Sequence, residues 1–422
     1  MAKFIGYRCS LCNAEYLPGQ VTYTCPKDGG NLDVLLDYDS IRQKFQPEDL
    51  ICRAEDSLWR YLPLLPVPDP GGAGTPIRSV GWTPVYSLPR LAQGLGLEHL
   101  WLKDESRNPT ASFKDRASAV VVARAREIRA EIVVTASTGN AGAALAGMSA
   151  AVGQKAIIFA PRSAPPSKVT QLLVYGAKVI LVDGSYDDAF DLTVKAADEF
   201  NWYCRNTGYN PFTAEGKKTA AFEIWEWWNG ENSEQRLENS GAIIHSPLTI
   251  FVSVGDGNII SGIHKGFKDL QALGWVEQTP RMIGVQAEGS AAIANAFHAG
   301  TEKIVPVSAK TIADSISVDL PRDGVRAVRA ARQTGGTYIK VSDDEILRAI
   351  AALGSQGIFA EPAGATAYAG LIKAIEQGIV KPEDPVLVLN TGSGLKDVHA
   401  AMQAVAEAPV IEPTLEAVKH LL

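Results

Sequence analysis

The stretch Ser112-Phe113-Lys114-Asp115-Arg116-Ala117 places a lysine just after a predicted strand, His99–Lys103, at the start of a predicted helix. Ser112 is a typical helix N-cap, and Asp115 three residues later completes a Ser-x-x-Asp capping box. Lys114 then lies in the first helical turn, where the helix dipole disfavours a cation and lowers the pKa of the amine. A Schiff-base lysine needs a neutral amine at neutral pH. Because most lysines are solvated surface charges, this interpretation of Lys114 depends on the motifs around it.

The composition restricts the classes of protein to which the chain can belong. Its 422 residues suit two or three domains, with 46% hydrophobic and 21% charged residues. A net charge of −7 and a pI near 5.5 favour a soluble protein and argue against a nucleic-acid partner. No apolar run approaches the ~20 residues of a membrane span, and the N-terminus has no signal-peptide pattern. Five cysteines, an odd number, fit a reducing cytoplasm.

The first 60 residues differ in character from the rest. Cys9-x-x-Cys12 and Cys25-x-x-Asp28 are similar to the two knuckles of a zinc ribbon that lacks its fourth cysteine. Structural zinc prefers four sulfur or nitrogen ligands, so we predict a degenerate ribbon over residues 1–60 with no metal, or with substoichiometric zinc. Four prolines and three glycines within Tyr61–Gly74 predict a linker over residues 61–76.

From Ile77 to about Gln403, short β-branched runs alternate with segments of helical period, which is typical of βαβ units around parallel sheets. We therefore expect an α/β fold. The predicted strands are Ile132–Thr135, Ala156–Phe159, Val179–Val182, Leu248–Val254, Met282–Gln286 and Val386–Leu389.

Polar or glycine-rich motifs follow three of these strands, at the carboxyl ends where α/β sheets bind ligands. Ala136-Ser137-Thr138-Gly139-Asn140-Ala141-Gly142 offers hydroxyls and backbone N–H groups for a carboxylate, although an ordinary helix cap fits equally well. Val254-Gly255-Asp256-Gly257-Asn258-Ile259 suits a phosphate nest, but a lone glycine loop is a weak signal. Asn390-Thr391-Gly392-Ser393-Gly394-Leu395-Lys396-Asp397 can bring a hydroxyl to a ring nitrogen, and is also consistent with a simple βα turn.

In this order, Lys114 and the three motifs resemble those of fold-type II pyridoxal-phosphate enzymes, the tryptophan synthase beta-like family, and most closely the threonine synthases. Further segments support the resemblance: Gly81-Trp82-Thr83-Pro84, Lys103-Asp104-Glu105 and Glu361-Pro362-Ala363-Gly364-Ala365. It implies two parallel-sheet, three-layer domains behind a ribbon-like module. The large cofactor-binding domain would span residues 77–130 and 211–408, the small substrate-closing domain residues 131–210, and a C-terminal tail residues 409–422.

The resemblance also implies a role for each motif. Pyridoxal 5'-phosphate would be the cofactor, and Lys114 would be the catalytic lysine that forms a Schiff base with it. Asn140 would contact the phenolic oxygen and Thr391 the pyridine nitrogen. The phosphate loop of the cofactor would comprise Gly255, Asp256, Gly257, Asn258 and Ile259, and the substrate site Ser137, Thr138, Gly139, Asn140 and Thr213.

The implied activity is that of a lyase of threonine biosynthesis, which turns O-phospho-L-homoserine and water into L-threonine and phosphate. The resemblance further implies a cytoplasmic homodimer with a small amino-acid substrate. One departure bears on that substrate. Many threonine synthases carry Asn-Pro-x-Arg, whose arginine binds the substrate phosphate, whereas this chain has Thr213 in that place, and Ser393 where histidine is usual. Replacement bases for the phosphate are Lys217, Lys218, Arg162 or Lys168.

Two other classes of function stay open at this point. The chain could catalyse another replacement or elimination, as threonine or serine ammonia-lyases and cysteate synthase do. It could also be a non-catalytic ligand-binding protein with a retained fold, although an intact Lys114 argues against that.

Overall fold

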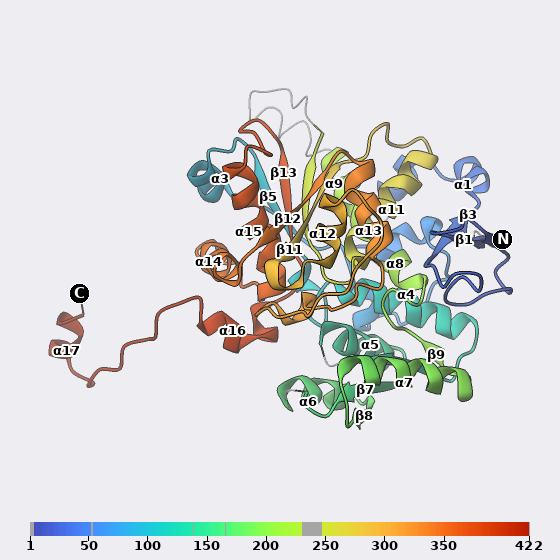
Figure 1. Cartoon of the computed structure of the whole chain (residues 1–422), viewed down its shortest axis with the longest axis horizontal. Coiled ribbons are helices and arrows are strands. Elements are labelled where there is room, and N and C mark those ends of the chain that lie inside the picture. The colour runs from blue at the N-terminus through green and yellow to red at the C-terminus, as the bar shows by residue number, and fades with distance from the viewer. Residues whose placement is uncertain (1–3, 52–53, 138, 165, 230–246, 422) are drawn as a thin grey trace.

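The structure is a computed structural model, and it describes residues 4–51, 54–137, 139–164, 166–229 and 247–421. Two sheets with helices on both faces form the body, and a three-stranded sheet from the N-terminus lies against one side of it (Figure 1). The α/β class predicted from the alternating pattern is confirmed. Within the described ranges, no helix is both long and apolar enough to cross a membrane.

The larger sheet has six strands. Their order is β12 (Thr337–Val341), β11 (Arg281–Ala287), β10 (Thr249–Ser253), β13 (Val386–Asn390), β5 (Leu100–Asp104) and β4 (Val85–Ser87). Five strands are parallel, and β4 pairs antiparallel with β5 at the edge. Side chains alternate between the two faces, so Phe251 packs in one core cluster while its neighbours Ile250 and Val252 pack in the other. One face is covered by α3 (Pro89–Leu95), α14 (Asp343–Gly354) and α15 (Pro362–Glu376), and the other by α11 (Asn258–Ala272), α12 (Ala292–His298) and α13 (Gly324–Gln333).

The smaller sheet has four parallel strands and lies below the larger one in Figure 1. Their order is β8 (Lys178–Val182), β7 (Lys155–Pro161), β6 (Ile132–Ala136) and β9 (Tyr203–Cys204). One face packs against α5 (Asn140–Ala151), which in turn packs on α4 (Lys114–Glu127), and the other against α7 (Tyr186–Glu199); α6 (Pro166–Val174) contacts α5 and β8. This layer falls within residues 131–210, the predicted small domain, although the domain division itself stays a prediction. Each of the seven predicted strands, His99–Lys103 included, overlaps a strand of the structure.

The N-terminal module shares its core with the body. Its antiparallel sheet is ordered β2 (Glu15–Tyr16), β1 (Phe4–Cys9) and β3 (Leu32–Leu36), and α1 (Tyr38–Lys44) and α2 (Pro47–Ile51) follow. The ring of Phe4 lies 5.7 Å from that of Phe212, and the Tyr38 hydroxyl donates to Asp269 Oδ1 at 2.6 Å. The module is therefore fastened by both apolar and polar contacts.

The segment predicted as a linker, residues 61–76, is packed against the body over its first part, residues 61–67. It begins within the 3-10 helix η1 (Leu58–Leu64), where the side chains of Tyr61 and Leu64 are buried. The Tyr61 hydroxyl donates to Glu226 Oε2 at 2.6 Å, and Trp59 Nε1 donates to the Ile77 carbonyl at 2.8 Å. Proline and glycine content predicts irregular backbone, but it carries no information about burial.

The C-terminal residues leave the body. Beyond α16 (Val398–Met402) the chain extends away to α17 (Leu415–Lys419), which stands apart at the end marked C (Figure 1). Val410, Leu415 and Leu421 are exposed there. The remaining helices are η2 (Pro76–Ser79), η3 (Glu105–Arg107), α8 (Phe212–Lys217), α9 (Thr219–Asn229), η4 (Glu288–Ser290), η5 (Asp314–Ile316) and η6 (Gly394–Lys396).

Candidate active site

The residues that follow β6, β10 and β13 meet at a cavity of about 1010 Å³. This is the edge at which open α/β sheets bind ligands. The predicted residues that line the cavity are Lys114, Ser137, Gly139, Asn140, Gly255, Asp256, Gly257, Asn258, Ile259 and Thr391. Thr138 lies outside the described residues. Four motifs that are far apart in sequence are thus gathered around one cavity, while the role of each residue stays a prediction.

Lys114 is the first residue of α4, and the backbone before it is fastened to the turn after β13. The Phe113 N–H donates to the Thr391 carbonyl at 2.9 Å, and the Ser393 N–H donates to the Ala111 carbonyl at 3.1 Å. These two bonds set the lysine and Thr391 on the same wall of the cavity.

The predicted capping box is wrong. The carboxylate of Asp115 accepts from the Thr110 backbone N–H at 2.6 Å and from the Thr110 hydroxyl, instead of bonding Ser112. Ser112 Oγ accepts from the Lys114 N–H at 3.4 Å, and the helix begins without a side-chain cap. Burial raises the pKa of Asp115 to about 6. The turn that brings Thr110 over the helix start follows from packing, which residue spacing alone does not reveal.

Three basic side chains perturb one another inside the cavity. Burial lowers the pKa of Lys114 and the charge of Arg205 lowers it further, while Glu361 opposes the shift. Burial also lowers the pKa of Lys217 well below its ordinary value, and Lys114 and Arg205 add to that effect. The predicted direction for Lys114 is confirmed, but its first cause is burial and not the helix terminus. A neutral amine and an anionic ligand are both favoured here.

Glu361 is a site residue to which the sequence analysis gave no role. Its carboxylate is 3% exposed, lines the cavity and accepts from Asn140 Nδ2 at 2.7 Å. Burial raises the pKa of Glu361, whereas Lys114 lowers it. Glu361 therefore orients the Asn140 amide and faces the lysine. Its position in a motif shared with the resembled family was the available signal.

The loop between β10 and α11 is shaped for a phosphate. Gly257 has φ = +88°, and a Cβ at this position would lie 2.7 Å from the Asp323 carbonyl oxygen. A Cβ at Gly255 would lie 2.8 Å from the Ile316 Cα. Glycine at both positions therefore lets the loop pack closely against Ile316 and Asp323, and the loop leads into a 15-residue helix, whose N-terminus favours an anion. Asp256 Oδ1 accepts from the Arg322 N–H at 3.2 Å.

The phosphate loop, the lysine of lowered pKa and the large cavity fit pyridoxal phosphate. Lys114 would hold its aldehyde carbon, the loop its phosphate and Thr391 its ring nitrogen. When bound, this cofactor acts as an electron sink for a carbanion next to an amino group.

The structure separates the four bases proposed to replace the missing arginine. Lys217 lines the cavity and donates to Asn258 Oδ1 at 2.6 Å. Lys168 also lines the cavity and pairs with Asp314. Lys218 is buried against Glu215 and Asp269, and Arg162 is 75% exposed; neither lines the cavity. Lys218 and Arg162 are therefore the wrong candidates.

Thr213 does not line the cavity either. Its hydroxyl is fully buried, 2.7 Å from the Asn210 carbonyl oxygen and 3.2 Å from Asn258 Oδ1, and its single proton can be donated to either acceptor. The predicted direct contact with substrate is therefore corrected to a contact with Asn258, because the threonine side chain is too short to reach past that amide.

A buried ion network holds the start of α4 from behind. Arg116 is completely buried; its Nε donates to Glu105 at 2.7 Å and its terminal nitrogens pair with Glu223 at 2.5 and 2.7 Å. Lys103 Nζ donates to Glu223 at 2.7 Å, and the Trp82 N–H donates to the same carboxylate at 2.8 Å. Trp82 and Lys103 belong to two of the segments that support the family resemblance, and their contacts with Glu223 thus help to position α4, which begins at Lys114.

This network predicts a loss of stability in acid. Burial alone would raise the pKa of Glu223, but the charges of Arg116 and Lys103 outweigh it and hold the value at about 2, against an ordinary 4.5. Because the pKa is lower in the folded state, the unfolded state binds more protons between these values, and stability falls as the pH falls through them. Urea unfolding at a series of pH values should show the free energy of unfolding falling as the pH falls. Glu223→Gln should make this dependence on pH weaker. The exposed Glu199→Gln should keep it, and an unchanged slope in Glu223→Gln would contradict the assignment.

Comparison with known proteins identifies the family of the chain. Residues 77–392 match the family described as pyridoxal-phosphate dependent enzyme. The threonine synthase of Methanocaldococcus jannaschii is 38% identical over 418 residues, and that of Methanosarcina acetivorans is 36% identical over 419, each match covering 98% of both chains.

Solved structures also share the fold. Threonine deaminase isoform 2 of Solanum lycopersicum has a TM-score of 0.64 at 22% identity, covering 79% of this chain and 86% of its own. Maize serine racemase has a TM-score of 0.61 at 24% identity, covering 80% and 92%. At these identities the structures bear on the fold alone. The match over residues 77–392 and the full-length relatives show that the chain belongs to the family of pyridoxal-phosphate dependent enzymes.

Proposed function

We propose that this enzyme is a threonine synthase, which converts O-phospho-L-homoserine and water to L-threonine and phosphate. The observation that carries the proposal is the full-length similarity to two proteins of that name, at 36–38% identity, in a chain whose lysine, phosphate loop and carboxylate loop line one cavity. The overall reaction breaks the Cγ–O bond, so phosphate leaves with the bridging oxygen, and water adds its oxygen at Cβ.

The residues of the cavity have separable tasks in this reaction. Ser137 and Gly139, at the start of the 12-residue helix α5, take the substrate carboxylate. Lys114 has a lowered pKa and moves protons at Cα and Cβ as a base and then as an acid. Thr391 offers the ring nitrogen of the cofactor a neutral hydroxyl, and Glu361 keeps the Asn140 amide in place.

Lys217 supplies the charge that an arginine at position 213 would have brought. The two positions are four residues apart on α8, so they lie on the same face of the helix. Both side chains bond Asn258 Oδ1, which places the Lys217 ammonium where a longer side chain at 213 would reach. Since its pKa is lowered by burial and by Lys114 and Arg205, a phosphate dianion nearby would stabilise its charged form.

Replacing Lys217 by methionine should therefore raise KM for O-phospho-L-homoserine by roughly 10- to 100-fold, since a hydrogen bond to a charged group is worth about 1.5–3 kcal/mol. Steady-state phosphate release measures KM, and cofactor titration by absorbance separates a lost substrate contact from lost cofactor. Arg162→Ala is the control and should behave as wild type. An unchanged KM in Lys217→Met would remove Lys217 from the phosphate site.

A substrate panel tests the proposed activity itself. Enzyme loaded with cofactor should release threonine and phosphate in equal amounts from O-phospho-L-homoserine. L-Threonine or L-serine should release little ammonia and 2-oxo acid by comparison. Preferential ammonia release, with no threonine formed from the phosphorylated substrate, would replace the proposal by an ammonia-lyase.

We also propose that the enzyme is a homodimer in the cytoplasm. The exposed apolar residues of the C-terminal tail, among them Val410 at 98% exposure, support contact with a second copy. The four cysteines among the described residues form no disulfide, which supports a reducing compartment.

A further inference from the structure

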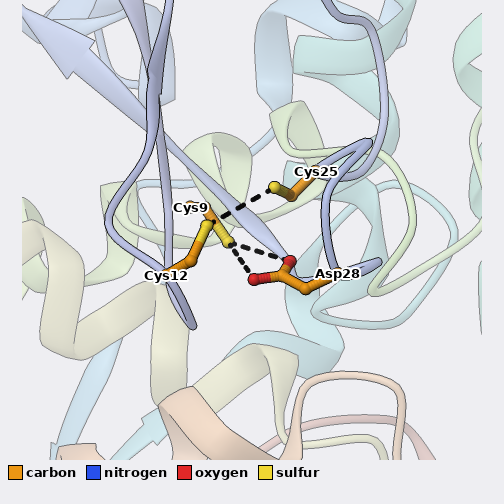
Figure 2. A group of neighbouring side chains, drawn as sticks. All are labelled: Cys9, Cys12, Cys25 and Asp28. Atoms are coloured by element: carbon orange, nitrogen blue, oxygen red, sulfur yellow. Dashed lines mark hydrogen bonds between the residues drawn. The ribbon is translucent and has the colours of Figure 1, made fainter.

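The N-terminal cysteines form a compact group far from the catalytic cavity in sequence. Cys9, Cys12, Cys25 and Asp28 each offer one ligand atom, and these four atoms all lie within 4.8 Å of one another. Figure 2 shows the three sulfurs and the carboxylate pointing toward one another from two loops. The sequence analysis predicted no metal here, or substoichiometric zinc, because the fourth cysteine is missing; the structure brings Asp28 close to the three sulfurs.

Two of the separations within the group, Cys12–Cys25 and Cys9–Asp28, are close to those of a tetrahedron around zinc. Zn–S bonds of about 2.3 Å and Zn–O bonds of about 2.0–2.2 Å give tetrahedral edges of about 3.6–3.8 Å. The sulfurs of Cys12 and Cys25 are 3.7 Å apart, and Asp28 Oδ2 and Oδ1 lie 3.6 and 3.3 Å from the sulfur of Cys9. The other ligand atoms of the group lie no more than 4.8 Å apart, so a bound cation would draw the longer edges inward.

The backbone around the group has the form of two metal-binding knuckles. The Leu11 N–H donates to the sulfur of Cys9 at 3.3 Å, and the Tyr16 hydroxyl lies 3.1 Å from that of Cys25. The Gly30 N–H donates to Asp28 Oδ1 at 2.9 Å, and a Cβ at Gly30 would lie 2.7 Å from the sulfur of Cys9. Partners of this kind orient ligands and tune their basicity.

We propose that Cys9, Cys12, Cys25 and Asp28 bind one structural Zn²⁺ per chain. Three thiolates select a thiophilic cation over Mg²⁺ or Ca²⁺, and a tetrahedral set that includes sulfur favours zinc among the available metals. All four positions are filled by protein, so the ion has a structural and not a catalytic role.

The proposed ion would fasten the module to the segment that supports the phosphate loop. The Ser10 carbonyl, between the first two ligands, accepts from Arg329, and the Asn31 side chain donates to the Arg322 carbonyl at 3.0 Å. The Arg322 N–H in turn donates to Asp256, and the Asp323 N–H donates to the Asp256 carbonyl at 2.9 Å. Loss of the ion should loosen this chain of contacts.

Elemental analysis of the purified, cofactor-loaded enzyme should find about one zinc per chain. Cys12 is exposed, so Cys12→Ala should fold and keep its cofactor. Its Kd for zinc, measured by competition with a chromogenic chelator, should rise by more than about 100-fold, because altering groups that only contact the ligands already costs roughly 10- to 100-fold in affinity. Asp28→Ala should also weaken binding, whereas Asp28→Cys should tighten it. Cys204→Ala removes a free thiol outside the group and is the matched control.

Cobalt substitution adds a readout of geometry. Co²⁺ in the wild-type site should give sulfur-to-metal charge-transfer bands and tetrahedral d–d bands at longer wavelengths than the cofactor absorbs, and both should be lost in Cys12→Ala. A metal-free enzyme whose thiols react freely or form a Cys12–Cys25 disulfide would overturn the proposal. So would zinc that remains bound with wild-type affinity in both Cys12→Ala and Asp28→Ala.

Discussion

Lys114→Ala is expected to abolish turnover while the protein folds and still takes up pyridoxal phosphate non-covalently. The side chain faces the cavity, and the phosphate loop at Gly255 and Gly257 does not depend on it. General acid–base catalysis alone contributes roughly 10²–10⁴-fold. Lys114 also carries the covalent attachment, so we expect the rate of threonine formation to fall by at least the upper end of that range.

Borohydride reduction locates the attachment. In the wild-type enzyme it should fix the cofactor on the peptide that contains Lys114, identified by mass spectrometry, and Lys114→Ala should lose that label. The exposed Lys178→Ala should keep both label and activity. A label on Lys217, a cavity lysine whose pKa burial lowers well below its ordinary value, would mean that the two lysines had been assigned the wrong way round.

Arg116→Met is expected to give the largest loss of stability of any single substitution considered. The arginine is completely buried between Glu105 and Glu223, and methionine would leave Glu105 without its cation. Removing one partner from a buried ion pair costs about 3–5 kcal/mol because the other charge stays desolvated. Urea unfolding should be followed by tryptophan fluorescence and by cofactor absorbance. With both signals the midpoint of unfolding should move to a lower urea concentration than in the wild-type enzyme.

The matched control is an ion pair of the same length at the surface. Lys155 pairs with Glu131 at 2.8 Å, and both side chains are exposed. Lys155→Ala should leave the urea midpoint unchanged. If Arg116→Met shifted the midpoint no more than Lys155→Ala does, the network behind Lys114 would not be a main support of the fold.

The sequence predicted the parts of this protein that follow from local patterns. Strands with short β-branched runs, such as Val386–Leu389, were predicted because a buried parallel strand needs a continuous apolar segment. Lys114, Gly257 and Thr391 were placed at strand ends, where the topology of parallel sheets gathers them at one edge. Edge strand β4 was missed because three residues, Val85–Ser87, give too short a pattern.

Features that depend on distant contacts were not predictable in the same way. Asp115 has capping-box spacing but bonds Thr110, because the chain folds back over the helix start. Arg205 and Glu361 reach the cavity from two different domains of the predicted division; no sequence motif indicates Arg205, and the motif that contains Glu361 did not indicate its contact with Asn140. The approach of Asp28 to the three sulfurs is likewise a matter of geometry, which only the arrangement around Cys9 reveals.

The reaction in water enriched in ¹⁸O tests the central claim most directly. With O-phospho-L-homoserine as substrate, breakage of the Cγ–O bond and addition of water at Cβ place one ¹⁸O atom in the hydroxyl of L-threonine and none in the released phosphate. Mass spectrometry of both products should show this pattern in the wild-type enzyme and no threonine in Lys114→Ala. Phosphate that carries ¹⁸O, together with unlabelled homoserine in place of threonine, would show simple ester hydrolysis and would contradict the account.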